Sequence, residues 1–460
     1  MTMAKMETLP GKPAATGPKP GRLASVRFDA AGLRARVLAS MGALLVGQGV
    51  TAGIQLLSLP LFLHFWDAAQ YGKWIMLTAV PAYFSMSDAG MLPVAANRIS
   101  MLRAGSDPTA ANVVFQSALA LVLTAIVVIG GGSALFLALL DSSVLDSDSR
   151  IALWLLIVAT LLSLFGGLYE AGFRAFGSFA QSVLYSNAAR ALEFCTMGLG
   201  LAIGGTFTDA ALGLLAGRAV GSLVIGAHCR NAFPDLRWSL EHASLAELRN
   251  LLRPALTFMA FPLGNALSIQ AITLVVGSLF GTVLVATFNT YRTLSRLVLQ
   301  LVSTLGNALW AEFSRLYGAG NQPTLLNVYR RGLVLGGVIS LTCSLAMVPL
   351  APLLLKWWTH GKIGFDAQVF VLFALVTLIG GLSTVPRVLL LSTNTHSRLG
   401  IFYLGLSSAS VLVTYATGKV LGPSGAVLAS AALEAAMLFL TVSLAKRMLS
   451  DMSVNNRDSN

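Results

Sequence analysis

The residues best suited to bind a ligand lie on one face of a long apolar segment, residues 282–310. Polar side chains recur there at steps of three or four: Asn289, Arg292, Arg296, Gln300, Ser303 and Asn307. This spacing places them on one face of an α-helix. The planar guanidinium of arginine donates paired hydrogen bonds to phosphate oxygens and stays charged at any physiological pH. The stripe therefore predicts an anion-binding site, and two arginines one turn apart suit a pyrophosphate.

The depth of these arginines supports the same interpretation. If residues 282–310 cross a membrane, Arg292 lies roughly 15 Å from the outer end of the span, near the midplane. An arginine that faces lipid at this depth costs at least about 2.5–3.5 kcal/mol. The stripe must therefore face either a water-filled cavity or polar partners inside the helix bundle, and the second reading would make it structural.

Two weaker polar stripes accompany the first. One lies in residues 39–65 and the other in residues 255–279. Their members are Gln48, Thr51, Gln55 and Ser58 in the first, and Thr257, Asn265 and Ser268 in the second. Each alone is typical of hydrogen bonding between helices. Together with the arginine stripe they predict a cavity shared by several helices, with Gln48, Gln55 and Asn265 among its substrate-binding residues.

The other charged residues inside apolar segments have several readings. Arg190 and Glu193 are three residues apart, which favours mutual neutralisation. Arg218 has no acid nearby in the sequence, so it either binds substrate or pairs with Glu434. Asp88 either titrates or pairs with an arginine. Asp88 and Glu434 are the candidates for ion coupling.

Arg387 and Glu170 lie near the inner ends of their spans, where side chains reach the interface and a structural role is expected.

Composition defines the class of protein. Of 460 residues, 55% are hydrophobic and only 11% are charged, whereas soluble domains are nearer 25% charged. The net charge of +12 does not indicate nucleic-acid binding, because the basic residues cluster in short loops between apolar runs.

The cysteines show no zinc-type spacing, and no nucleotide-binding motif occurs. We expect no metal, no cofactor and no catalytic residues, so the chain is not expected to be an enzyme.

Apolar runs long enough to cross a bilayer of roughly 30 Å recur along the chain. They predict an all-α polytopic membrane protein with about twelve transmembrane helices. The expected spans are residues 39–65, 74–97, 113–139, 151–173, 182–204, 209–228, 255–279, 282–310, 331–354, 367–392, 399–417 and 423–445. Lys and Arg gather in the tails and in alternate loops, which predicts an inner-membrane protein with both termini in the cytoplasm.

The polar segments divide the chain into parts. Residues 1–36 form a basic cytoplasmic tail, and residues 447–460 form a second tail. A six-helix lobe, residues 37–228, is joined to a second, residues 255–446, by a cytoplasmic linker, residues 229–254. Ser244 and Glu247 have the spacing of a capping box, which predicts an interfacial helix in this linker. The two lobes are expected to surround a central cavity.

Several motifs resemble those of a known family. They are Pro60-Leu-Phe-Leu, Ala69-Gln-Tyr-Gly72, Ser87-Asp-Ala-Gly90 and Asn97-Arg98, and later Thr290-Tyr-Arg-Thr-Leu-Ser-Arg296, Phe313-Ser-Arg-Leu-Tyr317 and Gly320-Asn321. The chain resembles bacterial polysaccharide and O-antigen flippases, a branch of the multidrug/oligosaccharidyl-lipid/polysaccharide exporter superfamily. The resemblance covers most of the chain in helix layout, but the long basic leader departs from the family's compact start.

The resemblance implies a transporter that opens alternately to each side of the membrane. Its substrate would be an oligosaccharide on an undecaprenyl pyrophosphate carrier, destined for lipopolysaccharide O-antigen, capsule or exopolysaccharide. Arg292 and Arg296 would hold the pyrophosphate. Membrane lipids and other polysaccharide-assembly proteins would be its partners, and nucleic acid would not.

Three alternatives stay open. A peptidoglycan lipid-precursor flippase needs similar arginines. A multidrug or cation antiporter of the same superfamily would favour unpaired acids in its cavity, whereas the strongest stripe here is basic. A membrane glycan polymerase or ligase is an enzyme with a similar number of spans, but long periplasmic loops are typical of such enzymes and are not expected here.

Overall fold

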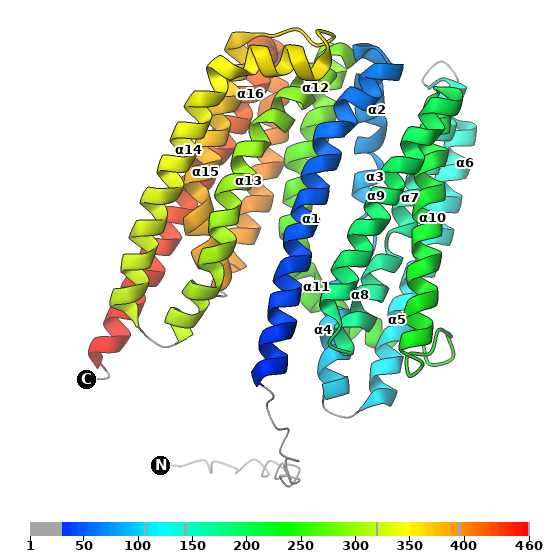
Figure 1. Cartoon of the computed structure of the whole chain (residues 1–460), viewed down its shortest axis with the longest axis vertical. Coiled ribbons are helices and arrows are strands. Elements are labelled where there is room, and N and C mark those ends of the chain that lie inside the picture. The colour runs from blue at the N-terminus through cyan, green and yellow to red at the C-terminus, as the bar shows by residue number, and fades with distance from the viewer. Residues whose placement is uncertain (1–29, 105–106, 142–144, 319–320, 394–396, 459–460) are drawn as a thin grey trace, which may run out of the picture.

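The computed structural model describes residues 30–104, 107–141, 145–318, 321–393 and 397–458. These residues form a bundle of helices without a strand (Figure 1). The helices run between two ends of the molecule, the upper and lower ends in Figure 1. Helix α1 begins and α16 finishes at the lower end. Residues 1–29 of the predicted basic tail lie outside the described residues.

The first half of the chain forms the helices on the right of Figure 1, with α1 and α2 near the middle. Three of the six expected spans there consist of several shorter helices. The elements are α1 (Ala30–Phe65), α2 (Ala68–Ala79), α3 (Pro81–Phe84), α4 (Met91–Ala104), α5 (Pro108–Ala125), the π-helical turn η1 (Ile126–Gly130), α6 (Gly131–Leu139), α7 (Ser147–Leu162), α8 (Phe165–Ala175), α9 (Phe179–Gly204) and α10 (Phe207–Ala232).

The second half contains longer helices. They are α11 (Leu245–Ala266), the π-helical turn η2 (Leu267–Ala271), α12 (Ile272–Phe280), α13 (Thr282–Gly318), α14 (Gln322–Thr359), α15 (Ala367–Ser392) and α16 (Ser397–Asp458). Helix α16 holds two expected spans and is broken at Gly422, whose φ of 65° and ψ of −152° favour glycine. Helix α11 is continuous through residues 245–266, so the predicted interfacial helix is the first part of a helix that enters the bundle.

Eight helices of the described chain are long and apolar enough to cross a membrane. Helices α9 and α13 are not among them, although each has more residues than a bilayer crossing needs. Both carry arginines inside their sequence, which lowers their hydropathy. Helix α13 contains the predicted stripe with Arg292 and Arg296, and α9 contains Arg190.

Local sequence signals explain where many helices begin. Asp67 and Gln70 form a reciprocal capping box at α2, and Thr206 and Asp209 form one at α10. At α11 the Ser244 hydroxyl accepts from the backbone N–H of Glu247 at 3.4 Å.

The predicted capping box at Ser244 is therefore only half formed, because the Glu247 carboxylate pairs with Arg98 of α4 at 3.0 Å.

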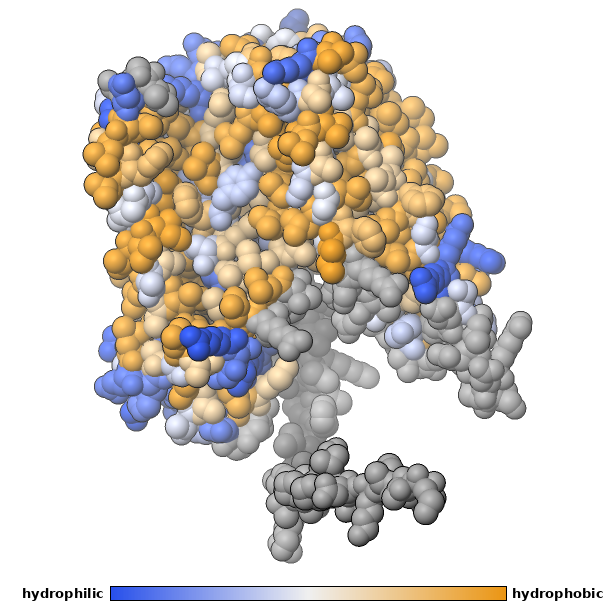
Figure 2. Space-filling view, turned by 180° about the vertical axis from the view of Figure 1, so that it is seen from behind, coloured by the Kyte–Doolittle hydropathy of each residue, from blue (hydrophilic) through white to orange (hydrophobic). Residues whose placement is uncertain are grey.

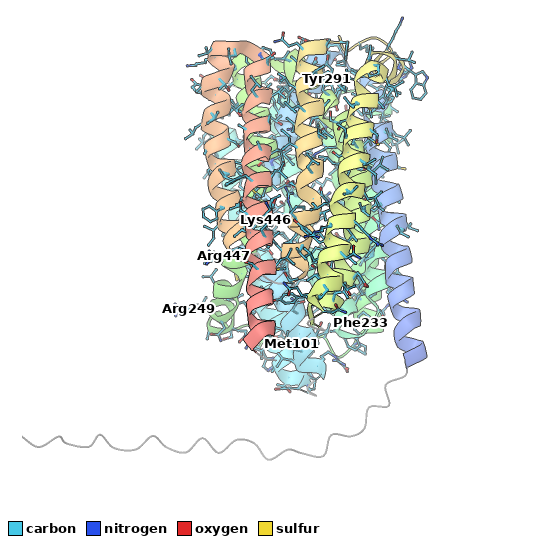
Figure 3. The ribbon with its side chains drawn as sticks, turned by 90° about the vertical axis from the view of Figure 1, so that its left-hand side faces the viewer. Met101, Phe233, Arg249, Tyr291, Lys446 and Arg447 are labelled. Carbon is cyan, nitrogen blue, oxygen red and sulfur yellow. The ribbon has the colours of Figure 1, made fainter. Side chains whose placement is uncertain are left out.

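The surface agrees with a membrane environment. On the face shown in Figure 2, apolar residues cover most of the middle of the molecule, and polar residues gather toward its two ends. Figure 3 shows Arg249, Lys446 and Arg447 in the lower half and Tyr291 near the upper end. All three basic side chains are exposed. These three basic residues come from α11 and α16, and the assignment of the lower end to the cytoplasm stays a prediction.

Candidate functional site

Helix α13 places Arg292 among neutral partners only. Its Nη1 donates to the carbonyl of Ile269 at 3.1 Å, and its Nη2 donates to Thr273 Oγ1 and Asn289 Oδ1, each at 2.9 Å. The guanidinium also lies 5.9 Å from the centroid of the Phe288 ring. No carboxylate of the described chain forms an ion pair with it. The positive charge of Arg292 is thus held in place without being neutralised.

The backbone partner of Arg292 lies in an irregular part of its helix. Ile269 belongs to η2, the π-helical turn between α11 and α12. A π-helical turn shifts the backbone bonding pattern and is common at functional sites. Here the carbonyl of Ile269 also accepts from the Thr273 hydroxyl at 2.7 Å. The turn therefore directs a carbonyl toward the guanidinium, and the sequence pattern gave no indication of it.

Asn289 extends this cluster to the first half of the chain. Its Nδ2 lies 3.4 Å from the hydroxyl of Tyr71 on α2. Tyr71 was not predicted as a site residue, although it lies in one of the motifs that carry the family resemblance. A chain of contacts thus runs from Thr273 of α12 through Arg292 and Asn289 of α13 to Tyr71 of α2.

Arg296 lies one turn below Arg292 and is exposed. Within the described residues it makes no hydrogen bond or ion pair, and Tyr403 and Glu434 of α16 interact with it electrostatically. Glu434 instead pairs with Arg387 of α15 at 3.7 Å. That contact is too long for a hydrogen bond, and the Glu434 Oε2 atom is buried without a hydrogen-bond partner.

Arg387 has a structural contact as well, since its Nη2 donates to the Ser383 hydroxyl at 3.1 Å.

The predicted stripes of α1 and α13 meet directly. Gln300 Nε2 donates to Gln55 Oε1 at 2.9 Å. Gln48 and Gln300 also line an open pocket of about 520 Å³ between α1, α13 and α14. Asn265 of α11 is exposed and has no hydrogen bond within the described part of the chain. The structure therefore brings Gln48, Gln55 and Gln300 together and leaves Asn265 apart from these contacts. The side chains of Thr257 and Asn307 lie outside the described set.

Two predicted pairings in the first half are wrong. Glu193 does not pair with Arg190, and Arg218 does not pair with Glu434. Arg218 instead holds Glu193 through two hydrogen bonds, from Nε at 2.8 Å and from Nη2 at 2.6 Å. Its Nη1 donates to the carbonyl of Ala159 at 3.0 Å. All three nitrogens are satisfied by protein groups, so Arg218 joins α7, α9 and α10 and is not free to bind substrate.

Asp88 also has a local structural role. Its carboxylate accepts from the backbone N–H groups of Gly90 at 3.2 Å and Leu92 at 3.1 Å, at the start of α4. The expected arginine partner is not found within the described residues. Gly90 has a φ of +73°, and a side chain there would approach the carbonyl of Ala255. Asp88 therefore stabilises the bend between α3 and α4.

The two halves are joined near the upper end. Trp358 Nε1 on α14 donates to the carbonyl of Leu56 on α1 at 2.7 Å. The Lys362 ammonium donates to the carbonyl of Leu63 and, at 3.3 Å, to that of Trp66. These contacts lie at the end of the molecule opposite the described termini (Figure 1). Sequence reasoning missed them because the acceptors are backbone carbonyls.

No group of three or more His, Cys, Asp or Glu in the described ranges has a geometry that could hold a metal ion.

Solved transporter structures share this fold. An inward-facing multidrug resistance MATE family transporter of the MOP superfamily is 15% identical, and the match covers 87% of this chain and 99% of that chain with a TM-score of 0.68. An outward-facing one is 14% identical, with 91% and 96% covered and a TM-score of 0.62. A MOP superfamily transporter from Pyrococcus furiosus Vc1, described as having a binding pocket of reversed polarity, is 14% identical, with 91% and 96% covered and a TM-score of 0.59. No curated protein matches the chain.

The fold is therefore that of MOP superfamily transporters. The sequence model of the polysaccharide biosynthesis protein family matches residues 37–316, from α1 through most of α13. This chain belongs to that family, as its motifs predicted. The matched region includes both Arg292 and Arg296.

Proposed function

We propose that this chain is a flippase that moves an undecaprenyl-pyrophosphate-linked oligosaccharide from the cytoplasmic to the periplasmic leaflet of the inner membrane. On this proposal twelve spans form two six-helix lobes, residues 37–228 and 255–446, with both termini in the cytoplasm. The glycan would serve surface polysaccharide synthesis, in contact with membrane lipids and other assembly proteins. The family and the fold support transport as the general activity.

The observation that carries the proposal is the state of Arg292. A structural arginine inside a membrane protein is normally neutralised by an acid, because an isolated charge in a medium of low dielectric constant is costly. Arg292 is held by a carbonyl, a hydroxyl and an amide, and Arg296 one turn away is unpaired within the described residues. Such a pair of guanidinium groups would gain most from an anionic ligand, and a pyrophosphate would suit two arginines one helical turn apart.

The other predicted residues receive roles in the same proposal. Asn289 orients Arg292, while Gln48, Gln55, Gln300 and Asn265 would bind hydroxyl groups of the glycan. Glu434 lies near both Arg296 and Arg387, so its protonation would change the charge beside the pyrophosphate site. We propose Glu434, and not the structurally engaged Asp88, as the site of ion coupling.

Alternating access would begin from a state that is closed at the upper, periplasmic end. The contacts of Trp358 and Lys362 with α1 support this, because they join the two halves at that end. All three are hydrogen bonds to backbone carbonyls, which can break and re-form without leaving a buried charge unpaired. Similarity to both inward- and outward-facing transporters agrees with a fold that has two states.

The experiment is lipid extraction from a deletion strain that carries wild-type or variant genes. We expect the deletion to accumulate undecaprenyl-linked oligosaccharide on the cytoplasmic leaflet. Wild type should clear it, Arg292→Ala and Arg296→Ala should not, and the two Lys variants should clear it poorly, because lysine keeps the charge but lacks the planar fork. Lys446→Ala, an exposed basic residue of α16, is the matched control.

Other outcomes identify the alternatives. Accumulation of the peptidoglycan precursor instead would make the chain a peptidoglycan lipid-precursor flippase. Full export by both Ala variants at normal protein levels would remove the arginine site from the mechanism.

A further inference from the structure

A second pocket lies within the first half of the molecule, between α1, α9 and α10. Its volume is about 240 Å³, and its walls include Thr51, Gln55, Arg190, Glu193, Phe194 and Met197. It shares Gln55 with the glutamine contact to α13. None of its charged residues has a role in the pyrophosphate site proposed above.

The charge balance of this pocket is positive. Both carboxylate oxygens of Glu193 accept hydrogen bonds from Arg218, so the two form a neutral pair. Arg190 is exposed and has no hydrogen bond or ion pair within the described residues. It lies eleven residues into α9, roughly 16 Å from the lower end of that helix. An unpaired arginine at this depth is costly unless it faces water or an anion.

The remaining wall suits one sugar ring. Gln55 uses its oxygen to accept from Gln300, and its amide N–H₂ has no hydrogen-bond partner among the described residues, so it can donate to a hydroxyl. The Thr51 hydroxyl donates to the carbonyl of Gly47 at 2.9 Å and can still accept. Phe194 and Met197 provide an apolar surface. The pocket is smaller than the roughly 300–1,000 Å³ of sites for drug-sized ligands, which favours a single ring over a whole oligosaccharide.

We propose that this pocket binds a negatively charged sugar residue of the transported glycan, with Arg190 contacting its carboxylate or phosphate. The inference rests on the proposed function and adds to it the class of glycan: an acidic one. A guanidinium binds either anion through paired hydrogen bonds. The contact between Gln55 and Gln300 places the pocket beside the stripe of α13, so one ligand can reach both subsites.

The test uses the full-length protein in lipid nanodiscs and three short-chain polyprenyl-pyrophosphate disaccharides. They end in glucose, glucuronate or glucose 6-phosphate and are otherwise identical. We expect at least one acidic probe to bind about tenfold more tightly than the neutral probe, as one charge-assisted contact allows. Arg190→Gln should abolish that preference and leave binding of the neutral probe unchanged. Lys446→Gln serves as the control for lost surface charge.

The outcomes separate this inference from the proposed function. Glucuronate and phosphate are distinguished by which acidic probe gains affinity. Equal binding of all three probes to wild type would overturn the acidic subsite and leave the flippase proposal intact. Competition with the acidic probes by phosphatidylglycerol alone would have the same consequence, because it would make this pocket a lipid site. Failure of every probe to bind would overturn both. Because Arg190 makes no hydrogen bond or ion pair within the described residues, Arg190→Gln should fold, and its thermal unfolding temperature provides the check.

Discussion

Arg218 and Arg292 lie in different halves of the molecule, and their surroundings differ in one decisive respect. Arg218 forms a two-point ion pair with Glu193 and donates its remaining nitrogen to a carbonyl. Arg292 makes as many contacts, but every one is to a neutral group. Hydrogen bonds hold both side chains in place. Only Arg292 keeps a positive charge that no carboxylate of the described chain neutralises.

This difference separates structural from functional arginines more clearly than sequence position does. Both residues are arginines inside apolar segments, and both were candidates for substrate binding. An arginine neutralised by an acid joins helices. An arginine whose hydrogen bonds all go to neutral acceptors is fixed in position and can still attract an anion. Arg190, which has no ion pair within the described residues, also retains its charge, but no hydrogen bond there holds its guanidinium in position.

The largest effect should follow from breaking the paired arginine. Arg218→Ala leaves Glu193 charged inside the bundle, where the side chains of the pair are only 21% and 15% exposed. We expect a loss of about 3–5 kcal/mol in unfolding free energy, seen as reduced membrane-inserted protein and a lower thermal unfolding temperature. The double variant Arg218→Gln/Glu193→Gln should recover much of the loss. Arg292→Gln should cost less, and a larger loss there would contradict the comparison.

The smallest effect should come from a pair at the exposed upper end. The hydrogen bond from Lys73 lowers the pKa of Asp146 from 3.8 to about 2, and both side chains are largely solvated. Because the folded pKa is lowered, the pair stabilises the protein above about pH 4, and this contribution disappears as the pH falls toward 2. Lys73→Met should lower stability by less than about 1 kcal/mol.

Unfolding temperatures of wild type and Lys73→Met, measured between pH 2 and pH 7, should differ at the high end and approach each other at the low end. A constant difference across that range would show that Lys73 acts by packing and not through its charge.

Much of the fold could be predicted from the sequence because apolar runs must cross the bilayer as helices. The helical class of fold followed from that constraint, and the family followed from the motifs in residues 60–98 and 290–321. The bends were harder, and the π-helical turn within residues 255–279 was not predicted. Its carbonyl at Ile269 turned out to be a main partner of Arg292.

The site was predicted in part. Steps of three and four identified the face of α13, because helical geometry fixes which residues share a face. The partners across helices could not be predicted, since they depend on packing. Sequence distance suggested Arg190 for Glu193, whereas the folded chain brings Arg218 from 25 residues away. Backbone acceptors such as the Leu56 carbonyl leave no mark in the sequence.

The most direct test of the central claim measures binding of a pyrophosphate lipid to the purified protein. The full chain in nanodiscs is titrated with farnesyl pyrophosphate, and wild type is compared with Arg292→Lys, Arg292→Ala and the control Lys446→Ala. If Arg292 binds a phosphate through two hydrogen bonds, Arg292→Lys should weaken the binding of farnesyl pyrophosphate about tenfold or more, and Arg292→Ala should weaken it further. The control should bind as wild type does. Wild-type affinity in Arg292→Ala would contradict the account.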